Sequence, residues 1–165
     1  MKKHVLYALT IASIFGVATA FADTATSTFQ VSATVADACS VASSDTLNFG
    51  TYNPLDGSVT TGNTDIDVTC TQSTGYNVGL SAGTGSGASV STRKMTSTTS
   101  SDTLEYTLYQ DSGYSSVWGE TIGSNTYSDD GTGLEQTIPV YGKIAASQNV
   151  PAGTYEDTIT VTVTY

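Results

Sequence analysis

The last eleven residues of the chain, 155–165, show the clearest alternation of apolar and polar positions. One parity carries Tyr155, Ile159, Val161, Val163 and Tyr165, and the other carries Thr158, Thr160, Thr162 and Thr164. Because successive side chains of a β-strand point to opposite faces, this stretch predicts a strand with one apolar face. The sequence ends on this strand, and we expect its second edge to be open to the addition of another strand.

A second alternation lies near the N-terminus. One parity carries Phe29, Val31, Ala33 and Val35, and the other carries Gln30, Ser32, Thr34 and Ala36. The residues just before it, 23–28, are small and mostly polar, as is typical of a flexible terminus. The pattern therefore predicts an apolar-faced strand behind a flexible lead, an arrangement that makes sense if another protein takes hold of the strand.

Further short alternations between these two stretches predict the strands of a core. Their apolar positions are Leu47 and Phe49; Ile66, Val68 and Cys70; Tyr76, Val78 and Leu80; Leu104, Tyr106 and Leu108; and Ile138, Val140 and Ile144. After residue 22 we find no apolar residues at helical spacing. About six or seven clear strands separated by turn signals predict an all-β sandwich of immunoglobulin-like size.

Glycine, serine and proline mark the connections between these strands. The Gly- and Ser-rich segment 81–91 predicts a mobile hairpin tip, and segment 123–133 predicts a loop. Val117 and Trp118 are expected to form a brief return strand. Pro139 predicts a strand start or an edge position, because proline cannot donate to a ladder.

The first 22 residues have the pattern of a secretory signal peptide. Two lysines, Lys2 and Lys3, precede the apolar run 5–17, and Ala20-Phe21-Ala22 fits a cleavage site. Cleavage after Ala20 is the alternative. No later apolar run is long enough to span a bilayer, so we expect an exported product without membrane insertion. The remaining 143 residues, 23–165, fit one domain.

Charge and histidine content narrow the possible functions. Cleavage removes the only histidine, His4, and leaves three basic residues against fifteen acidic ones, a formal net charge of −12. Such a surface repels phosphate backbones and anionic lipids, which argues against nucleic-acid or membrane-surface partners. The acidic residues are dispersed, as expected of a solubilising surface. Without histidine, the usual histidine-assisted serine, cysteine and metal chemistries are excluded.

The chain has two cysteines, Cys39 and Cys70, which allow only one intrachain pairing. In an exported protein we predict that they form a disulfide rather than two free thiols. Closing a loop of about 32 residues is expected to stabilise the fold by roughly 3.5–4 kcal/mol through the entropy of the unfolded chain.

Paired carboxylates are the main candidates for an enzyme site. Asp65 with Asp67, or Asp129 with Asp130, could serve a secreted glycoside hydrolase. Asp65 and Asp67 flank Ile66 on the outward parity of a strand, so a solvated surface is the favoured interpretation. Asp129 and Asp130 precede Gly131 without the spacing of a calcium loop, so a turn is favoured there. We therefore assign no catalytic, cofactor or metal residue.

Aromatic residues offer a further binding hypothesis. Trp118 with Tyr114 and Tyr127 could form a platform for the apolar face of a sugar. In a tyrosine-rich β protein, half-buried sheet positions are the favoured interpretation.

Several motifs, taken in order, resemble one known family. They are Cys39 behind an alternating strand, Leu47-Asn48-Phe49-Gly50, Val68-Thr69-Cys70, Tyr106-Thr107-Leu108-Tyr109, Ile138-Pro139-Val140-Tyr141-Gly142, and Gly153-Thr154-Tyr155-Glu156-Asp157 with the Thr-Val-Thr-Val ending. Together they are similar to the spore coat protein U domain, the domain of archaic, Csu-type chaperone–usher pilins. The resemblance covers essentially all of residues 23–165.

The resemblance implies an incomplete immunoglobulin-like β-sandwich that is completed by a donor strand from another subunit. It divides the chain into a signal peptide (1–22), a donor-strand extension (23–36) and a pilin domain (37–165). The implied donor residues are Phe29, Val31, Ala33 and Val35, and those of the acceptor groove and chaperone-binding strand are Ile159, Val161, Val163 and Tyr165. Strand addition of this kind draws affinity from main-chain hydrogen bonds and register from alternate side chains.

The resemblance also implies partners and a location. A periplasmic chaperone, an outer-membrane usher and other pilin subunits would be the partners, and the product would be an extracellular fimbrium that supports adhesion and biofilm formation. A tip or minor adhesin of the same pilus is the first alternative. A tip subunit is expected to add a ligand-binding domain and needs no donor segment, whereas this chain has one predicted domain and a predicted donor.

Overall fold

The computed structural model describes residues 22–43 and 46–165, which form nine strands and no helix. The strands are β1 (Cys39–Ser43), β2 (Thr60–Cys70), β3 (Gly75–Leu80), β4 (Arg93–Ser97), β5 (Thr103–Tyr109), β6 (Tyr127–Asp130), β7 (Glu135–Ile144), β8 (Tyr155–Glu156) and β9 (Val161–Thr164). Within these described ranges, no helix is long and apolar enough to cross a membrane. Apart from Ala22, the predicted signal peptide lies outside the described residues.

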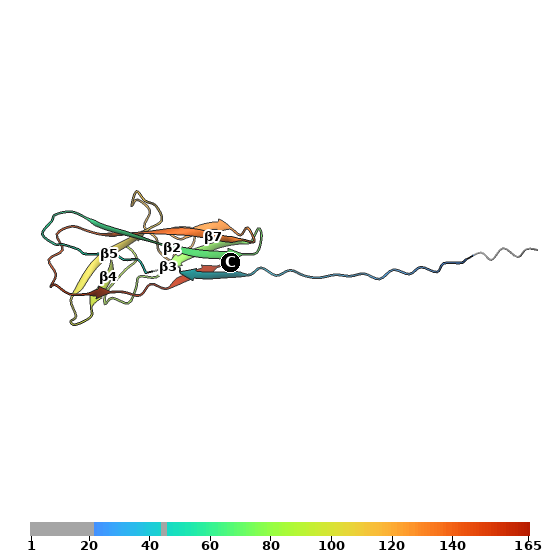
Figure 1. The fold of residues 1–165 in the computed structure, drawn as a ribbon, viewed down its shortest axis with the longest axis horizontal. Coiled ribbons are helices and arrows are strands. Elements are labelled where there is room, and N and C mark those ends of the chain that lie inside the picture. The colour runs from blue at the N-terminus through green and yellow to red at the C-terminus, as the bar shows by residue number, and fades with distance from the viewer. Residues whose placement is uncertain (1–21, 44–45) are drawn as a thin grey trace, which may run out of the picture. The chain divides into compact units, whose positions relative to one another are not determined.

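The strands form two antiparallel sheets. The larger sheet has the order β1-β2-β7-β5-β4-β8, and the smaller sheet has the order β6-β3-β9. Figure 1 shows the long strands β2 and β7 running side by side, in agreement with their ladder from Thr60–Ile144 to Thr69–Glu135. Residues Val35–Tyr165 form one compact unit.

A single apolar core joins the two sheets. Its fully or nearly buried members are Ile66, Val68 and Cys70 of β2, Tyr76, Val78 and Leu80 of β3, Leu104, Tyr106 and Leu108 of β5, Ile138, Val140 and Ile144 of β7, and Trp118. The indole Nε1 of Trp118 donates a 2.8 Å hydrogen bond to the backbone oxygen of Val78. The alternating positions predicted from the sequence therefore face one core between two sheets, and the predicted immunoglobulin-like all-β sandwich is confirmed.

The segment Leu47–Phe49 does not form the predicted short strand. Its side chains instead cover two glycines on the inner face of the larger sheet. A Cβ at Gly142 would lie 2.7 Å from Cζ of Phe49, and one at Gly62 would lie 3.1 Å from Cδ2 of Leu47. Because these glycines leave room above β7 and β2, the segment packs through side chains rather than through a ladder.

The segment predicted as a loop at 123–133 contains strand β6, so the turn predicted at Asp129 and Asp130 is wrong. Both residues pair with β3 at the edge of the smaller sheet, in the registers Tyr76–Asp129 and Gly75–Asp130. Tyr127, at the start of β6, packs 5.9 Å from the ring of Trp118, measured between centroids. Tertiary packing of Tyr127 therefore outweighs the weak strand preference of aspartate, whose side chains stay exposed at this edge.

The hairpin predicted at 81–91 is also wrong, because β3 and β4 belong to different sheets. Arg93, the first residue of β4, is fully buried and holds this connection together. Its guanidinium donates to the backbone oxygens of Leu80, Ser81, Val90 and Trp118 at 2.7–2.9 Å. The sequence predicted a mobile tip because a single arginine gives no local signal of such long-range bonds.

Pro139 lies inside β7 but beyond the end of its ladder with β5. That ladder stops at the Tyr109–Tyr141 pair, whereas Pro139 faces Asp65 of β2. The strand is therefore locally an edge at Pro139, as the missing backbone N–H predicts. Val117 forms only an isolated bridge to Tyr109 in place of the predicted return strand.

Candidate functional site

The C-terminal stretch forms two strands in different sheets, which corrects the prediction of one continuous strand. β8 pairs with β4 in the larger sheet, and β9 pairs with β3 in the smaller sheet. Asp157 lies where the chain passes from the larger sheet to the smaller one, a point that we call the crossing. Its carboxylate accepts hydrogen bonds from the backbone N–H of Thr84 (2.7 Å), the hydroxyl of Thr84 (2.9 Å) and the hydroxyl of Tyr106 (2.7 Å). These bonds fix the point from which the chain enters β9.

The predicted alternation itself is present across the crossing. Ile159, Val161 and Val163 are half-buried and pack against the core, whereas the four threonines between and beside them are exposed. Val161 lies opposite Leu80, and Val163 lies opposite Val78. Tyr165, the fourth predicted acceptor residue, is 60% exposed, so it does not join the half-buried row.

Two strand edges are unpaired on the same side of the sandwich. β1 ends the larger sheet and β9 ends the smaller one. Cα atoms of β1 and β9 approach within 8 Å, yet among the described residues no ladder joins the two strands. Figure 1 shows β1, in teal, beside the C-terminal end of the chain.

The side chains along this junction are only partly covered. Val41 of β1 lies opposite the fully buried Val68, so it faces the core, but it remains 40% exposed. On the other side, Ile159, Val161 and Val163 are half-buried. We call these four residues, together with the free edges of β1 and β9 beside them, the open seam. The open seam combines incompletely covered apolar side chains with two free backbone edges, the features to which an extended segment adds as a strand.

The predicted donor residues lie in a part of the chain without strand structure. Residues 22–38 join no ladder, and the side chains of Phe29, Val31 and Val35 are 88%, 82% and 86% exposed. Ala33 is exposed as well. The strand predicted here is therefore absent from the single chain, and we refer to residues 23–36 as the N-terminal tail.

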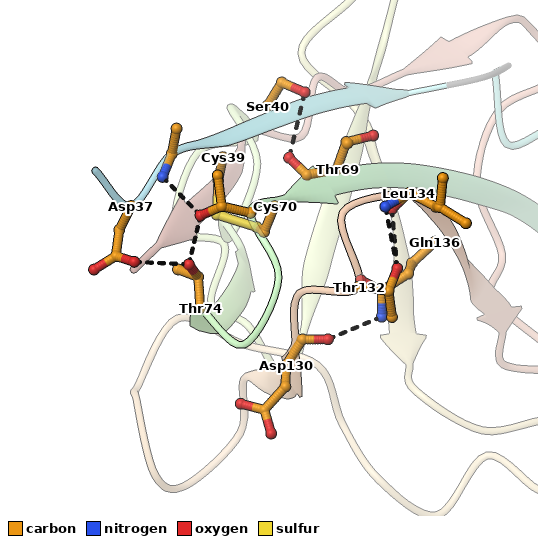
Figure 2. The surroundings of a disulfide bond; sticks show 12 residues. Asp37, Cys39, Ser40, Thr69, Cys70, Thr74, Asp130, Thr132, Leu134 and Gln136 are labelled. Carbon is orange, nitrogen blue, oxygen red and sulfur yellow. Dashed lines mark hydrogen bonds between the residues drawn. A yellow bond between two sulfur atoms is a disulfide. The ribbon is translucent and has the colours of Figure 1, made fainter. Parts of the chain in front are cut away.

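The predicted disulfide between Cys39 and Cys70 is confirmed. The two residues lie opposite each other at the start of β1 and the end of β2 (Figure 2). β1 has a neighbouring strand on one side only, so the covalent bond adds to a short ladder that would otherwise fray. The disulfide thus holds one wall of the open seam in place.

A hydrogen-bonded cluster beside the disulfide holds the point where the tail joins β1. The backbone of Ala38 pairs with Thr71 in both directions: its N–H donates to the Thr71 hydroxyl (3.2 Å), and its oxygen accepts from the Thr71 N–H (2.9 Å). The hydroxyl of Thr74 donates to the carboxylate of Asp37 at 2.9 Å and lies 2.6 Å from the hydroxyl of Thr71. Figure 2 shows Asp37 turned toward Thr74 below the disulfide. We call Asp37, Ala38, Thr71 and Thr74 the root cluster.

Sequence reasoning missed the root cluster. The only available signal was position, since Asp37 and Ala38 directly precede Cys39 and Thr71 directly follows Cys70. A hydroxyl–carboxylate contact across 37 residues has no local pattern from which it could be predicted.

Burial sets the ionisation of two groups near the crossing at Asp157. Burial raises the pKa of Tyr106, and the hydrogen bond to Asp157 and the negative charge of that carboxylate raise it further. Burial lowers the pKa of Arg93, while Tyr106 and Asp157 oppose this effect. The raised pKa keeps Tyr106 neutral, and four backbone oxygens accept hydrogen bonds from the buried guanidinium of Arg93, so both groups have structural roles at the crossing.

The alternative sites considered from the sequence have structural explanations. Asp67 accepts a 2.8 Å hydrogen bond from Thr137 on the neighbouring strand β7. Asp129 accepts from the side-chain amide of Gln136 at 3.1 Å. Among the described residues, no group of three or more histidine, cysteine, aspartate or glutamate side chains is placed to hold a metal ion.

The proposed sugar platform does not form, because Trp118 is fully buried. Its indole lies in the core against Tyr127, and Tyr114 packs instead against the ring of Tyr109, 5.5 Å away between centroids. The three aromatic residues therefore present no common face.

Comparison with known proteins agrees with this architecture. A model of the Spore Coat Protein U domain matches residues 25–162. The chain is 37% identical over 177 residues to "Protein U" of Myxococcus xanthus, covering 100% of this chain and 98% of that protein. The resemblance predicted from the motifs is thereby confirmed.

A solved structure shares the fold. The chain is similar, with a TM-score of 0.60 and 25% identity, to a chain in the crystal structure of the CsuC–CsuE chaperone–tip adhesion subunit pre-assembly complex from the archaic chaperone–usher Csu pili of Acinetobacter baumannii. The match covers 80% of this chain and 41% of that chain. From the family match over residues 25–162 and the full-length similarity to Protein U, the chain belongs to the Spore Coat Protein U domain family.

Proposed function

We propose that this protein is a structural subunit of a surface pilus and that it polymerises by donor-strand exchange. The observation that carries the proposal is the open seam, where β1 and β9 each end a sheet and leave Val41 and the β9 side chains partly uncovered. A strand that pairs with both edges would cover these side chains, and β1 and β9, whose Cα atoms approach within 8 Å, would separate to two strand spacings, about 9.5 Å, to admit it. That gain of backbone hydrogen bonds and apolar burial would drive assembly.

The tail supplies a segment with the required pattern. Phe29, Val31, Ala33 and Val35 lie at every second position, as do Ile159, Val161 and Val163. Segments with period-two patterns can interleave their apolar faces when one is added as a strand beside the other. The tail's apolar side chains are exposed in the single chain, so they would lose solvent contact on entering another subunit.

Assembly of such a subunit requires a partner that covers the seam before polymerisation. The similarity to a chaperone–subunit complex of the Csu pili supports a periplasmic chaperone in this role. An outer-membrane usher as the assembly platform, an extracellular fimbrium as the product, and roles in adhesion and biofilm formation complete the proposal. Tyr165, which directly follows β9 and is exposed, is proposed to extend the chaperone-binding strand when the chaperone binds.

A tip or minor adhesin subunit of the same pilus is the second candidate. The similar solved complex contains a tip adhesion subunit, which favours considering this role. A tip subunit does not need to donate a strand, whereas the exposed alternating tail favours a subunit within the fibre. The experiment below separates the two roles, because only a donating subunit depends on Val31 for assembly.

The test is to place a charge on the apolar face of the tail. Val31→Asp is expected to leave the domain folded and bound to the chaperone, because the side chain is solvated there, but to abolish fibres. A carboxylate buried without a partner in the next subunit costs several kcal/mol. Ser32→Asp is the matched control, since it adds the same charge on the opposite parity. Chaperone-bound subunit in the periplasm and fibres on the cell surface are measured separately.

Changes in β9 are expected to act differently. Val161→Asp places the charge against the core and should reduce both folding and chaperone capture, whereas Thr162→Asp, on the exposed face, should be tolerated. Normal fibres from the Val31→Asp variant would contradict the donor role of the tail.

A further inference from the structure

We propose that the root cluster directs the tail into a second copy of the chain by preventing it from folding back into its own open seam. This inference rests on the proposed function, in which the tail is the donor and the seam the acceptor. It concerns the choice between donation within one chain and donation between chains. That choice decides whether the subunit caps itself as a monomer or polymerises.

Self-capping is a real competitor because the tail is covalently attached beside the seam. Val35 is separated from Cys39, the first residue of β1, by only three residues. A segment tethered this closely has a very high effective concentration at its own seam. Something in the chain must therefore disfavour the intramolecular reaction if the subunit is to polymerise.

A tail that ran parallel to β1 could not enter its own seam. Parallel neighbouring strands need a crossover connection of roughly a dozen residues or more. Residues 36–38 are too few, so connectivity alone excludes this direction.

A tail that ran antiparallel to β1 would need a tight reversal at residues 36–38. Three-residue hairpin loops are common, but they require a residue with positive φ near their end. The junction Val35-Ala36-Asp37-Ala38-Cys39 contains no glycine or asparagine, and its only residue type that readily takes a positive φ is Asp37, whose carboxylate is bound by Thr74. No residue of the junction has a positive φ in the described chain, so the reversal is absent from the structure. The local sequence therefore disfavours the reversal.

The root cluster adds a second obstacle to the same reversal. Ala38, just before the β1–β2 ladder, is held on both sides, because its oxygen accepts from the Thr71 N–H and its N–H donates to the Thr71 hydroxyl. Asp37 is held by the hydroxyl of Thr74, a nearly buried residue in the turn between β2 and β3. Two of the three residues that would have to form the loop are thus bound to Thr71 and Thr74, in the turn that follows β2. A hairpin would have to break these hydrogen bonds before it gained any bond in the seam.

The experiment is to build the missing turn and ask whether the subunit caps itself. Ala36→Asn combined with Asp37→Gly introduces an Asn-Gly turn and removes the carboxylate of the root cluster. The purified chain is unfolded with its disulfide intact and refolded at two protein concentrations, and its mass and the protease resistance of its tail are measured. The parent is expected to give multimers or unstable monomers with a sensitive tail. The double variant is expected to give at least a tenfold larger fraction of monomer with a protected tail, independent of concentration.

A second variant tests the root cluster without changing the junction. Thr74→Val keeps the shape of the side chain but removes the bond to Asp37, and it is expected to raise the fraction of tail-protected monomer severalfold. An unchanged fraction in both variants would overturn the inference, as would a parent chain that already forms tail-protected monomers.

Adding Val31→Asp to each background separates this inference from the proposed function. In the double variant it should abolish tail protection, which shows that the tail occupies the seam through its apolar face. In the parent background it should abolish multimers. Multimers that persist with Val31→Asp would contradict the proposed function itself, whatever the turn variant does.

Discussion

The hydroxyl of Tyr106 donates a 2.7 Å hydrogen bond to the carboxylate of Asp157, and this contact joins β5 of the larger sheet to the segment that crosses into the smaller one. Asp157 also accepts two hydrogen bonds from Thr84. Because β9 begins four residues after Asp157, these bonds help to set the position of one wall of the open seam. The contact therefore connects the stability of the core to the geometry of the acceptor.

Two buried tyrosines provide a matched test of this contact. Tyr106→Phe removes the bond to Asp157 and is expected to lower the free energy of unfolding by about 1–3 kcal/mol. Tyr76→Phe is expected to leave it unchanged or raise it by about 1 kcal/mol, since the Tyr76 hydroxyl is buried and has no hydrogen-bond partner among the described residues. Denaturant unfolding of the two variants and the parent measures the difference. Equal losses in both variants would contradict the role given to the Tyr106 hydroxyl.

The same tyrosines predict a loss of stability at high pH. Burial, with contributions from Asp129 and Tyr127, raises the pKa of Tyr76 to about 12, and the pKa of Tyr106 is also raised. An unfolded tyrosine releases its proton near pH 10, so above that pH the unfolded chain binds fewer protons than the folded chain. The contribution of these two tyrosines to the free energy of unfolding is therefore fully present below about pH 10 and is lost as the pH rises toward 12.

Unfolding measured between pH 9 and 12 tests this prediction. The parent should show a steeper decline than Tyr76→Phe, by about one proton in the linkage slope. Identical slopes would mean that Tyr76 titrates normally in the folded chain.

The apolar pattern of the sequence predicted which residues face the core, because burial follows the two-residue repeat directly. Val68, Val78 and Val140, for example, all lie in the core as their parity predicts. The same pattern identified the alternation at Ile159, Val161 and Val163. It could not show that the chain changes sheets at Asp157, because that change depends on hydrogen bonds from Thr84 and Tyr106, which are distant in sequence.

The features that the sequence did not predict are polar and long-range. Asp37 binds Thr74, and Arg93 binds oxygens that lie up to 25 residues away. Neither residue type has a strong local preference for such a role, so nothing in the sequence placed either residue in a long-range hydrogen-bond cluster. The strand at Asp129 was missed for a related reason, since β6 depends on its pairing with β3.

Arg93 is expected to contribute strongly to the stability of the fold in spite of its position beside a Gly- and Ser-rich segment. Arg93→Met fills much of the same volume but leaves the backbone oxygens of Leu80 and Trp118 without their buried donor. We expect a loss of roughly 3–5 kcal/mol in the free energy of unfolding, because several hydrogen bonds to a charged group are lost together. Lys94→Met is the control, since the neighbouring Lys94 makes only a 3.8 Å ion pair with the exposed Glu105. Similar stability of the two variants, measured by denaturant unfolding, would contradict the assignment.

A copy of the tail added at the C-terminus should supply the seam with a strand from the same chain, by a route that the root cluster does not block. A flexible linker and a copy of residues 28–37 are added after Tyr165, so that the copy can fold back beside β9. We expect a monomer that melts substantially higher than the parent, because the added strand pairs with both free edges and covers Val41, Val161 and Val163. The control carries aspartate at the copied position of Val31 and should gain little, because the buried carboxylate opposes insertion. Light scattering and thermal unfolding decide the outcome. A parent chain that is already monomeric and melts at the same temperature as the extended chain would show that the seam is not an acceptor.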